Sequence, residues 1–102
     1  MTPTKKQYDD LVEKYGKVSV IEIEGDLVAT FHYNLDRNSL SKALSLSSND
    51  PVLATEIIFN SVSIKEFTSP ELYDVKRPML LMSIAAELGS VMELKKTNVK
   101  VY

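Results

Sequence analysis

Cysteine is absent from this sequence of 102 residues, histidine occurs once and glycine three times. Without cysteine the chain cannot form disulfides, thiolate zinc sites, iron–sulfur clusters or a cysteine nucleophile. With glycine only at Gly16, Gly25 and Gly89, it carries neither a Walker loop nor a G-x-G-x-x-G loop. Nucleotide binding through those motifs is therefore excluded.

A basic excess is also missing, because Lys plus Arg is 12 against 14 for Asp plus Glu, which gives a net charge of -2. Proteins that neutralise phosphates usually carry such an excess, so we expect no nucleic-acid partner. The longest nearly continuous apolar run, 79–86, is far shorter than the roughly 20 residues that span a bilayer. The first ten residues lack the apolar core of a signal peptide. We expect a soluble protein without membrane contact.

What is present indicates one globular domain over residues 1–102, with 44% hydrophobic and 25% charged residues. A chain of this size buries about 60–70% of the surface that its unfolded form exposes. Its core is therefore modest, and added stability from a neighbouring subunit would be no surprise.

The first third of the chain predicts a helix and a β-hairpin. Thr2 with Pro3 suits a helix start, and Gly16 suits the end of that helix. Residues 18–24 are rich in β-branched side chains, as a strand is, and residues 27–33 alternate in side-chain character as a second strand does. The Gly25-Asp26 pair between them predicts a tight turn with a positive φ at its first residue.

The remaining residues predict helices. Asp36 is typical of an N-cap, Asp50-Pro51 of a second helix start, and Ser69-Pro70 repeats the cap-plus-proline signal. From residue 79 to about residue 96 the apolar spacing is helical. The sequence thus predicts an α+β fold with an N-terminal helix, a β-hairpin, two short helices and a long C-terminal helix.

No residue set predicts catalysis, a cofactor or a metal, so we expect a non-enzymatic protein. His32 is the only histidine, lies on the strand face opposite Phe31, and has no nucleophile motif to activate. A structural role is the favoured interpretation. Glu22 and Glu24 share a strand face and could present oxygens to a metal ion, but hydrated exposure is the commoner state of such pairs.

The predicted last helix is the feature that we weigh most, because its apolar surface extends around most of its circumference. One interpretation is the core helix of a small domain. The other is a helix whose second apolar face packs on another subunit, for which methionine is well suited. The candidate partner-binding residues on this second interpretation are Leu80, Met82 and Met92, with Phe59 from the middle helix and Lys95 and Lys96 as a docking patch for an acidic partner.

The order of segments also carries a resemblance. A strand pair is followed by Leu35-Asp36-Arg37, by Ala43, by N-D-P-V-L-A-T-E-I-I-F-N at 49–60 and by a helix that ends with E-L-K-K at 93–96. This order resembles small proteins encoded among the head and tail morphogenesis genes of tailed phages. Those proteins pair a short hairpin with a similar D-P segment and a closing helix. Some are tail assembly chaperones, and others, in crAss-like phages, are auxiliary head proteins.

The resemblance covers roughly residues 18–97 and implies a function without transferring any catalytic residue. It implies a phage virion structural protein, an auxiliary capsid or head component that binds the major capsid protein or other virion proteins. Such a protein is oligomeric within an assembly and joins the virion in the host cytoplasm. A tail assembly chaperone is one alternative, and a bacterial adaptor or regulatory binding module is the other.

Overall fold

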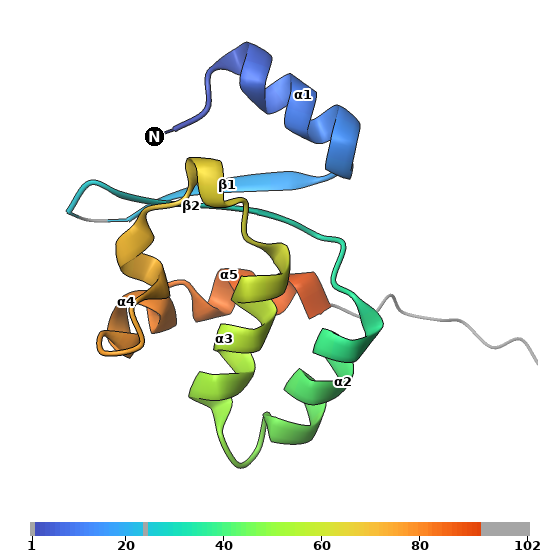
Figure 1. The fold of residues 1–102 in the computed structure, drawn as a ribbon, viewed down its shortest axis with the longest axis vertical. Coiled ribbons are helices and arrows are strands. Elements are labelled where there is room, and N and C mark those ends of the chain that lie inside the picture. Colours follow the sequence, from blue (N-terminus) through green and yellow to red (C-terminus); the bar gives the residue numbers. More distant parts are fainter. Residues whose placement is uncertain (1, 24, 93–102) are drawn as a thin grey trace, which may run out of the picture.

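The structure, a computed structural model, describes residues 2–23 and 25–92 and has an α+β fold (Figure 1). The elements, in chain order, are α1 (Lys5–Tyr15), β1 (Val18–Ile23), β2 (Leu27–His32), α2 (Arg37–Leu46), α3 (Pro51–Val62), the 3-10 turns η1 (Lys65–Phe67) and η2 (Pro70–Tyr73), α4 (Pro78–Met82), α5 (Ala85–Gly89) and the 3-10 turn η3 (Ser90–Met92). The predicted helix, hairpin and pair of short helices are confirmed.

The two strands form an antiparallel hairpin, as predicted. Gly25 and Asp26 both have positive φ, at 93° and 62°, which matches the right-handed twist of the strands on either side. Ala29 and Phe31 are fully buried on the face toward the helical core. The opposite face carries Val28, Thr30 and His32, because successive side chains in a strand alternate between faces.

Helix α1 begins two residues later than the sequence predicted, with Thr4 as its cap in place of Thr2. Thr4 accepts a hydrogen bond from the backbone of Gln7, and the Gln7 side chain accepts one from the backbone of Thr4. This reciprocal pair is a capping box. From Thr2 the third helical position would be Lys5, whose side chain cannot accept a hydrogen bond, so the later start is favoured.

Helices α2 and α3 pack against each other, and α3 also packs against β2. Their caps are Asp36 and Asp50, which accept hydrogen bonds from Ser39 N and Leu53 N, both as predicted. The buried core joins these helices to β2 and to the later short helices through Phe31, Ala43, Ile58, Phe59, Val62, Leu72, Leu81, Ile84 and Leu88.

The long C-terminal helix predicted from the sequence is not shown. Over the described residues the segment forms α4 and α5, with a break at Ser83 and Ile84, where Ile84 has φ −112° and ψ 13°. The hydroxyl of Ser83 donates to the carbonyl of Leu80 at 2.6 Å, and such side-chain bonds compete with helical ones. Residues 93–96 of the prediction lie outside the described part.

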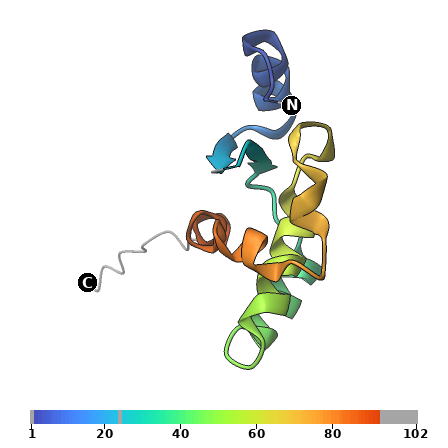
Figure 2. The ribbon, with the colours of Figure 1, turned by 90° about the vertical axis from the view of Figure 1, so that its left-hand side faces the viewer.

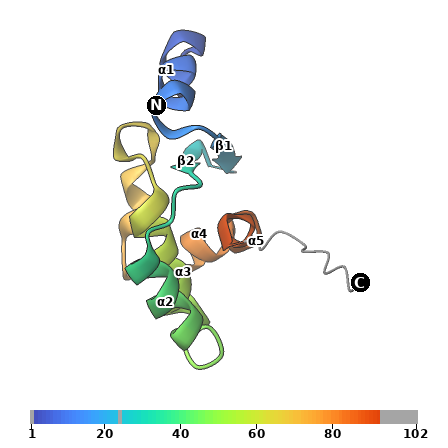
Figure 3. The ribbon, with the colours of Figure 1, turned by 90° about the vertical axis from the view of Figure 1, so that its right-hand side faces the viewer.

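Helix α1 lies on the outer side of the hairpin, and α2 to α5 lie on its inner side (Figures 1, 2 and 3). No residue of α1 is buried. No described helix is long and apolar enough to cross a membrane.

Candidate protein-binding surface

The most exposed apolar side chains of the described residues lie on and just before α4. Val75 and Met79 are each 76% exposed. The backbone there is fixed by a tight turn in which Asp74 accepts a hydrogen bond from Lys76 N at 2.9 Å. Lys76 and Arg77 are exposed as well, so two apolar side chains project into water within a charged segment. We call Val75, Met79, Leu80 and Met82 the α4 surface.

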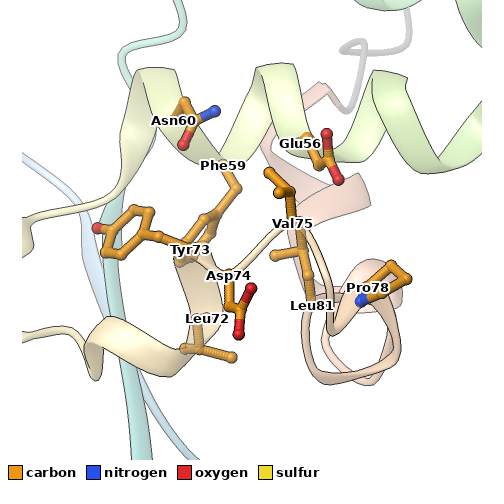
Figure 4. Close-up of a pocket in the computed structure, with 9 residues that line it drawn as sticks. All are labelled: Glu56, Phe59, Asn60, Leu72, Tyr73, Asp74, Val75, Pro78 and Leu81. Atoms are coloured by element: carbon orange, nitrogen blue, oxygen red, sulfur yellow. The ribbon is translucent and has the colours of Figure 1, made fainter.

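A small cavity of about 40 Å³ lies beside this surface, between α3, η2 and α4. Figure 4 shows Glu56 and Asn60 of α3 on one side of it, and Leu72 and Asp74 on the other. The ring of Phe59 forms part of the lining and packs on Tyr73 at a centroid distance of 5.1 Å. The cavity is large enough for a water molecule or a methyl group, but not for a cofactor.

The structure places the predicted partner-binding residues unequally. Leu80 and Met82 are half-buried, and Leu80 packs on the core. Phe59 is only 1% exposed and belongs to the core, so the prediction of a surface role for its side chain is not kept. The side chain of Met92 and all of Lys95 and Lys96 lie outside the described part of the chain.

Val75 is the residue of this surface that the sequence did not reveal. It stands alone among charged residues in D-V-K-R, so no periodic pattern marks it. The only available signal was its position between the 3-10 turn and Pro78, where a short loop has few neighbours that can cover a side chain.

A second apolar feature lies between α2, α3 and α5. It is a notch of about 160 Å³, lined largely by small side chains such as Ala43, Ala54 and Ala85. Leu44 of α2 and Leu53 of α3 are 57% and 40% exposed. The helical half of the molecule therefore exposes apolar side chains in two places, at the α4 surface and on α2 and α3.

The outer edge of β2 is closed by residues 63–69. Val28 and Thr30 direct their backbone groups away from β1, because Ser69 N donates to Val28 O and Ile64 N donates to Thr30 O, each at 2.8 Å. Two side-chain hydroxyls complete the pairing: Ser69 Oγ accepts from Val28 N at 2.8 Å, and Thr68 Oγ1 accepts from Thr30 N at 3.2 Å.

The outer edge of β1 is open over part of its length. Val20 and Glu22 lie opposite Thr30 and Val28 in the register, so their backbone groups also point away from the partner strand. Tyr8 Oη donates to the carbonyl of Val18 at 3.0 Å. At this edge Val20 and Glu22 have no hydrogen bond to any other described residue. An exposed edge of this kind can accept a strand from another polypeptide.

The residues weighed for catalysis do not assemble into a site among the described residues. His32 stacks on Tyr15, with a centroid distance of 4.6 Å and an interplanar angle of 8°. No three His, Cys, Asp or Glu side chains within residues 2–23 and 25–92 are grouped so that they could hold a metal ion. Glu24 lies outside the described residues.

Comparison with known proteins adds information on the fold. No family model matches the chain, and no curated protein matches it. Among solved structures, the chain is similar to an uncharacterised protein from Bacillus stearothermophilus, with 24% identity and a TM-score of 0.55. The match covers 91% of this chain and 99% of the other. At this identity the likeness shows a shared fold and carries no function.

Proposed function

We propose that this chain is a non-enzymatic protein-binding component of a tailed-phage particle, an auxiliary head protein that binds the major capsid protein or another virion protein. The observation that carries the binding role is the α4 surface, where Val75 and Met79 leave 76% of each side chain in water. Burying apolar area contributes roughly 25 cal/mol per Å² before the costs of association.

The chemistry of the α4 surface suits a protein partner. Methionine is unbranched and adapts to irregular neighbours, so Met79 and Met82 can pack on a surface that is not an exact complement. Lys76 and Arg77 beside them can pair with acidic groups at the rim of the contact. A stable interface buries about 1,200–2,000 Å² in total, so the partner must also contact residues around this surface.

The phage assignment rests on the order of sequence segments: the hairpin, the N-D-P helix start at 49–51 and the closing apolar segment. The hairpin and the helix that begins at Pro51 are both present in the fold. A subunit that joins a virion in the host cytoplasm, and is then held in the virion by contacts with its neighbours, needs no catalytic site.

A tail assembly chaperone is the second candidate function. The observation that favours it is the notch between α2, α3 and α5, whose small and apolar lining suits the reversible binding of a side chain from another polypeptide. On this proposal the chain binds a tape-measure-like protein during assembly and is absent from the finished particle.

Quantitative mass spectrometry of gradient-purified particles tests both proposals. The particles are produced from three versions of the phage genome, which encode the wild-type chain, V75S/M79S or L44S. L44S is the control, because Leu44 is exposed on α2, away from the α4 surface. A virion component is present at a fixed number of copies per particle, and V75S/M79S lowers that number by about tenfold, the effect of losing about 1.4 kcal/mol of binding.

Presence in assembly intermediates alone supports the chaperone. Absence from both particles and intermediates would contradict the phage assignment. Equal incorporation of V75S/M79S and wild type would show that the α4 surface is not the binding surface.

A further inference from the structure

Helix α1 is held on the hairpin by a few contacts, two of which are made by its last residue, Tyr15. The amide of Asn34 donates from Nδ2 to the carbonyl of Tyr15 at 2.9 Å, and the Tyr15 ring stacks on the ring of His32. Tyr8 adds its hydrogen bond to the Val18 carbonyl. Since no residue of α1 is buried, these contacts and the partial cover of its apolar stripe account for its docking.

The docked arrangement requires a neutral imidazole at His32. The backbone N–H of Asn34 donates to His32 Nδ1 at 3.0 Å, so Nδ1 is an acceptor and the ring proton is on Nε2. Protonation adds a hydrogen at Nδ1, where it opposes the N–H of Asn34. The loop that positions the Asn34 side chain on Tyr15 then loses its anchor.

The surroundings of His32 also oppose a positive charge. Burial lowers the pKa of the imidazole below its ordinary value of 6.5. The charged group that the described contacts place on the stack is a cation, Lys14, whose Nζ lies 5.1 Å from the centroid of the Tyr15 ring. Tyr15 is the other ionisable side chain that the described contacts place against the His32 ring.

We propose that α1 is an arm that acid releases: protonation of His32 undocks α1 from the hairpin and leaves the rest of the fold intact. Release frees the Val18 carbonyl at the open edge of β1. It also uncovers the outer face of β1, where Val18 is only 5% exposed when α1 is docked. The arm therefore controls whether the open edge of β1 at Val20 and Glu22 extends to Val18.

Amide hydrogen exchange between pH 7.5 and 5.0, read by NMR on the full chain, tests this inference. Protection factors, which correct for the intrinsic effect of pH on exchange, are expected to fall for α1 as His32 protonates and to stay constant for α3. The opening constant of α1 can rise by up to tenfold for each unit by which the docked pKa of His32 lies below its undocked value.

Two variants keep the inference open to contradiction. H32F retains an aromatic ring beside Tyr15 and removes the titration, and H32N retains an acceptor near the position of Nδ1. Either is expected to make the protection of α1 independent of pH. As a matched control, Y8F removes the hydrogen bond to Val18, weakens α1 at every pH and leaves the pH dependence in place.

Two results would overturn the proposal. One is an unchanged protection of α1 while the His32 ring resonances show that it has become protonated. The other is the same pH dependence in H32F and H32N as in the wild type.

Discussion

Hydroxyl side chains decide how the sheet ends beside β2. Thr68 Oγ1 accepts from Thr30 N, and it lies 2.7 Å from the carbonyl oxygen of Ile64 and 3.1 Å from that of Thr30, to which it can donate. Thr30 Oγ1 donates to Phe67 O at 2.7 Å. The sequence did not reveal this arrangement, because it pairs residues nearly 40 positions apart. Ser69 was interpreted as a helix cap, yet its hydroxyl accepts from Val28 in the strand.

Replacing Thr68 by Val removes this hydroxyl and keeps the shape of the side chain. Thr30 N then lacks a partner in a site where Thr68 is 2% exposed. Leaving a buried N–H unpaired costs about 1–3 kcal/mol, so we expect the free energy of unfolding in urea to fall by that amount.

The control for this change is T55V. Thr55 Oγ1 donates to Pro51 O at the notch between α2, α3 and α5, and this hydrogen bond is exposed, so water can replace it. Its free energy of unfolding should stay within about 0.5 kcal/mol of the wild type. Equal losses in the two variants would show that the β2 edge needs no hydroxyl at position 68.

At the scale of elements, short-range signals predicted the structure well. The Gly25-Asp26 turn, the Gly16 stop and the Asp36 and Asp50 caps depend on residues within four positions of one another, and all four are present. The prediction of one continuous last helix was wrong, because α4 and α5 are separate over the described residues. The helical apolar spacing from residue 79 includes Leu81, Ile84 and Leu88, which the structure buries, but the spacing is the same whether or not the backbone breaks at Ser83.

The contact between the N-cap of α2 and the last turn of α3 predicts how stability depends on pH. Ser61 Oγ of α3 donates to Asp36 Oδ1 at 2.7 Å, and this hydrogen bond is the main cause that lowers the pKa of Asp36 from 3.8 to about 2, followed by the bonds from Ser39. A carboxylate with a lowered pKa stabilises the fold above pH 3.8. This contribution is lost as the pH falls from 3.8 through about 2, because the unfolded chain binds the proton first.

Ser61→Ala is therefore expected to raise the pKa of Asp36 toward its ordinary value, as followed by the carboxyl carbon resonance in an NMR titration. Ser45→Ala is the control, since the Ser45 hydroxyl lies on α2 and donates to Lys42 O instead. An Asp36 pKa that Ser61→Ala leaves unchanged would mean that the cap bonds from Ser39 alone set it.

At the scale of the whole molecule, the last segment has a dual character. Leu81, Ile84 and Leu88 are almost fully buried, whereas Val75 and Met79 are exposed. The sequence predicted an excess of apolar surface around residues 79–92, and Met79 is the described residue of that range whose exposure fits this expectation. It did not locate Val75, because exposure in a loop depends on how the chain turns around it and not on local spacing.

This division predicts that substitutions at exposed and at buried positions of the segment change the free energy of unfolding by very different amounts. V75S/M79S changes only exposed side chains, so the free energy of unfolding should stay within about 0.5 kcal/mol of the wild type. L81A removes buried atoms from the core and should cost about 2–5 kcal/mol. Urea unfolding followed by circular dichroism measures both, and a large loss in V75S/M79S would mean that Val75 and Met79 stabilise the fold itself.

The hydroxyl closure of β2 has a consequence for stoichiometry. A sheet with two open edges can add strands from both sides and grow into a fibre without limit. Among the described residues, this hairpin leaves backbone groups unpaired at the edge of β1, whereas the edge of β2 is already paired with residues 63–69. Two copies that pair through their β1 edges therefore expose only closed β2 edges, so backbone pairing between copies of this hairpin stops at two.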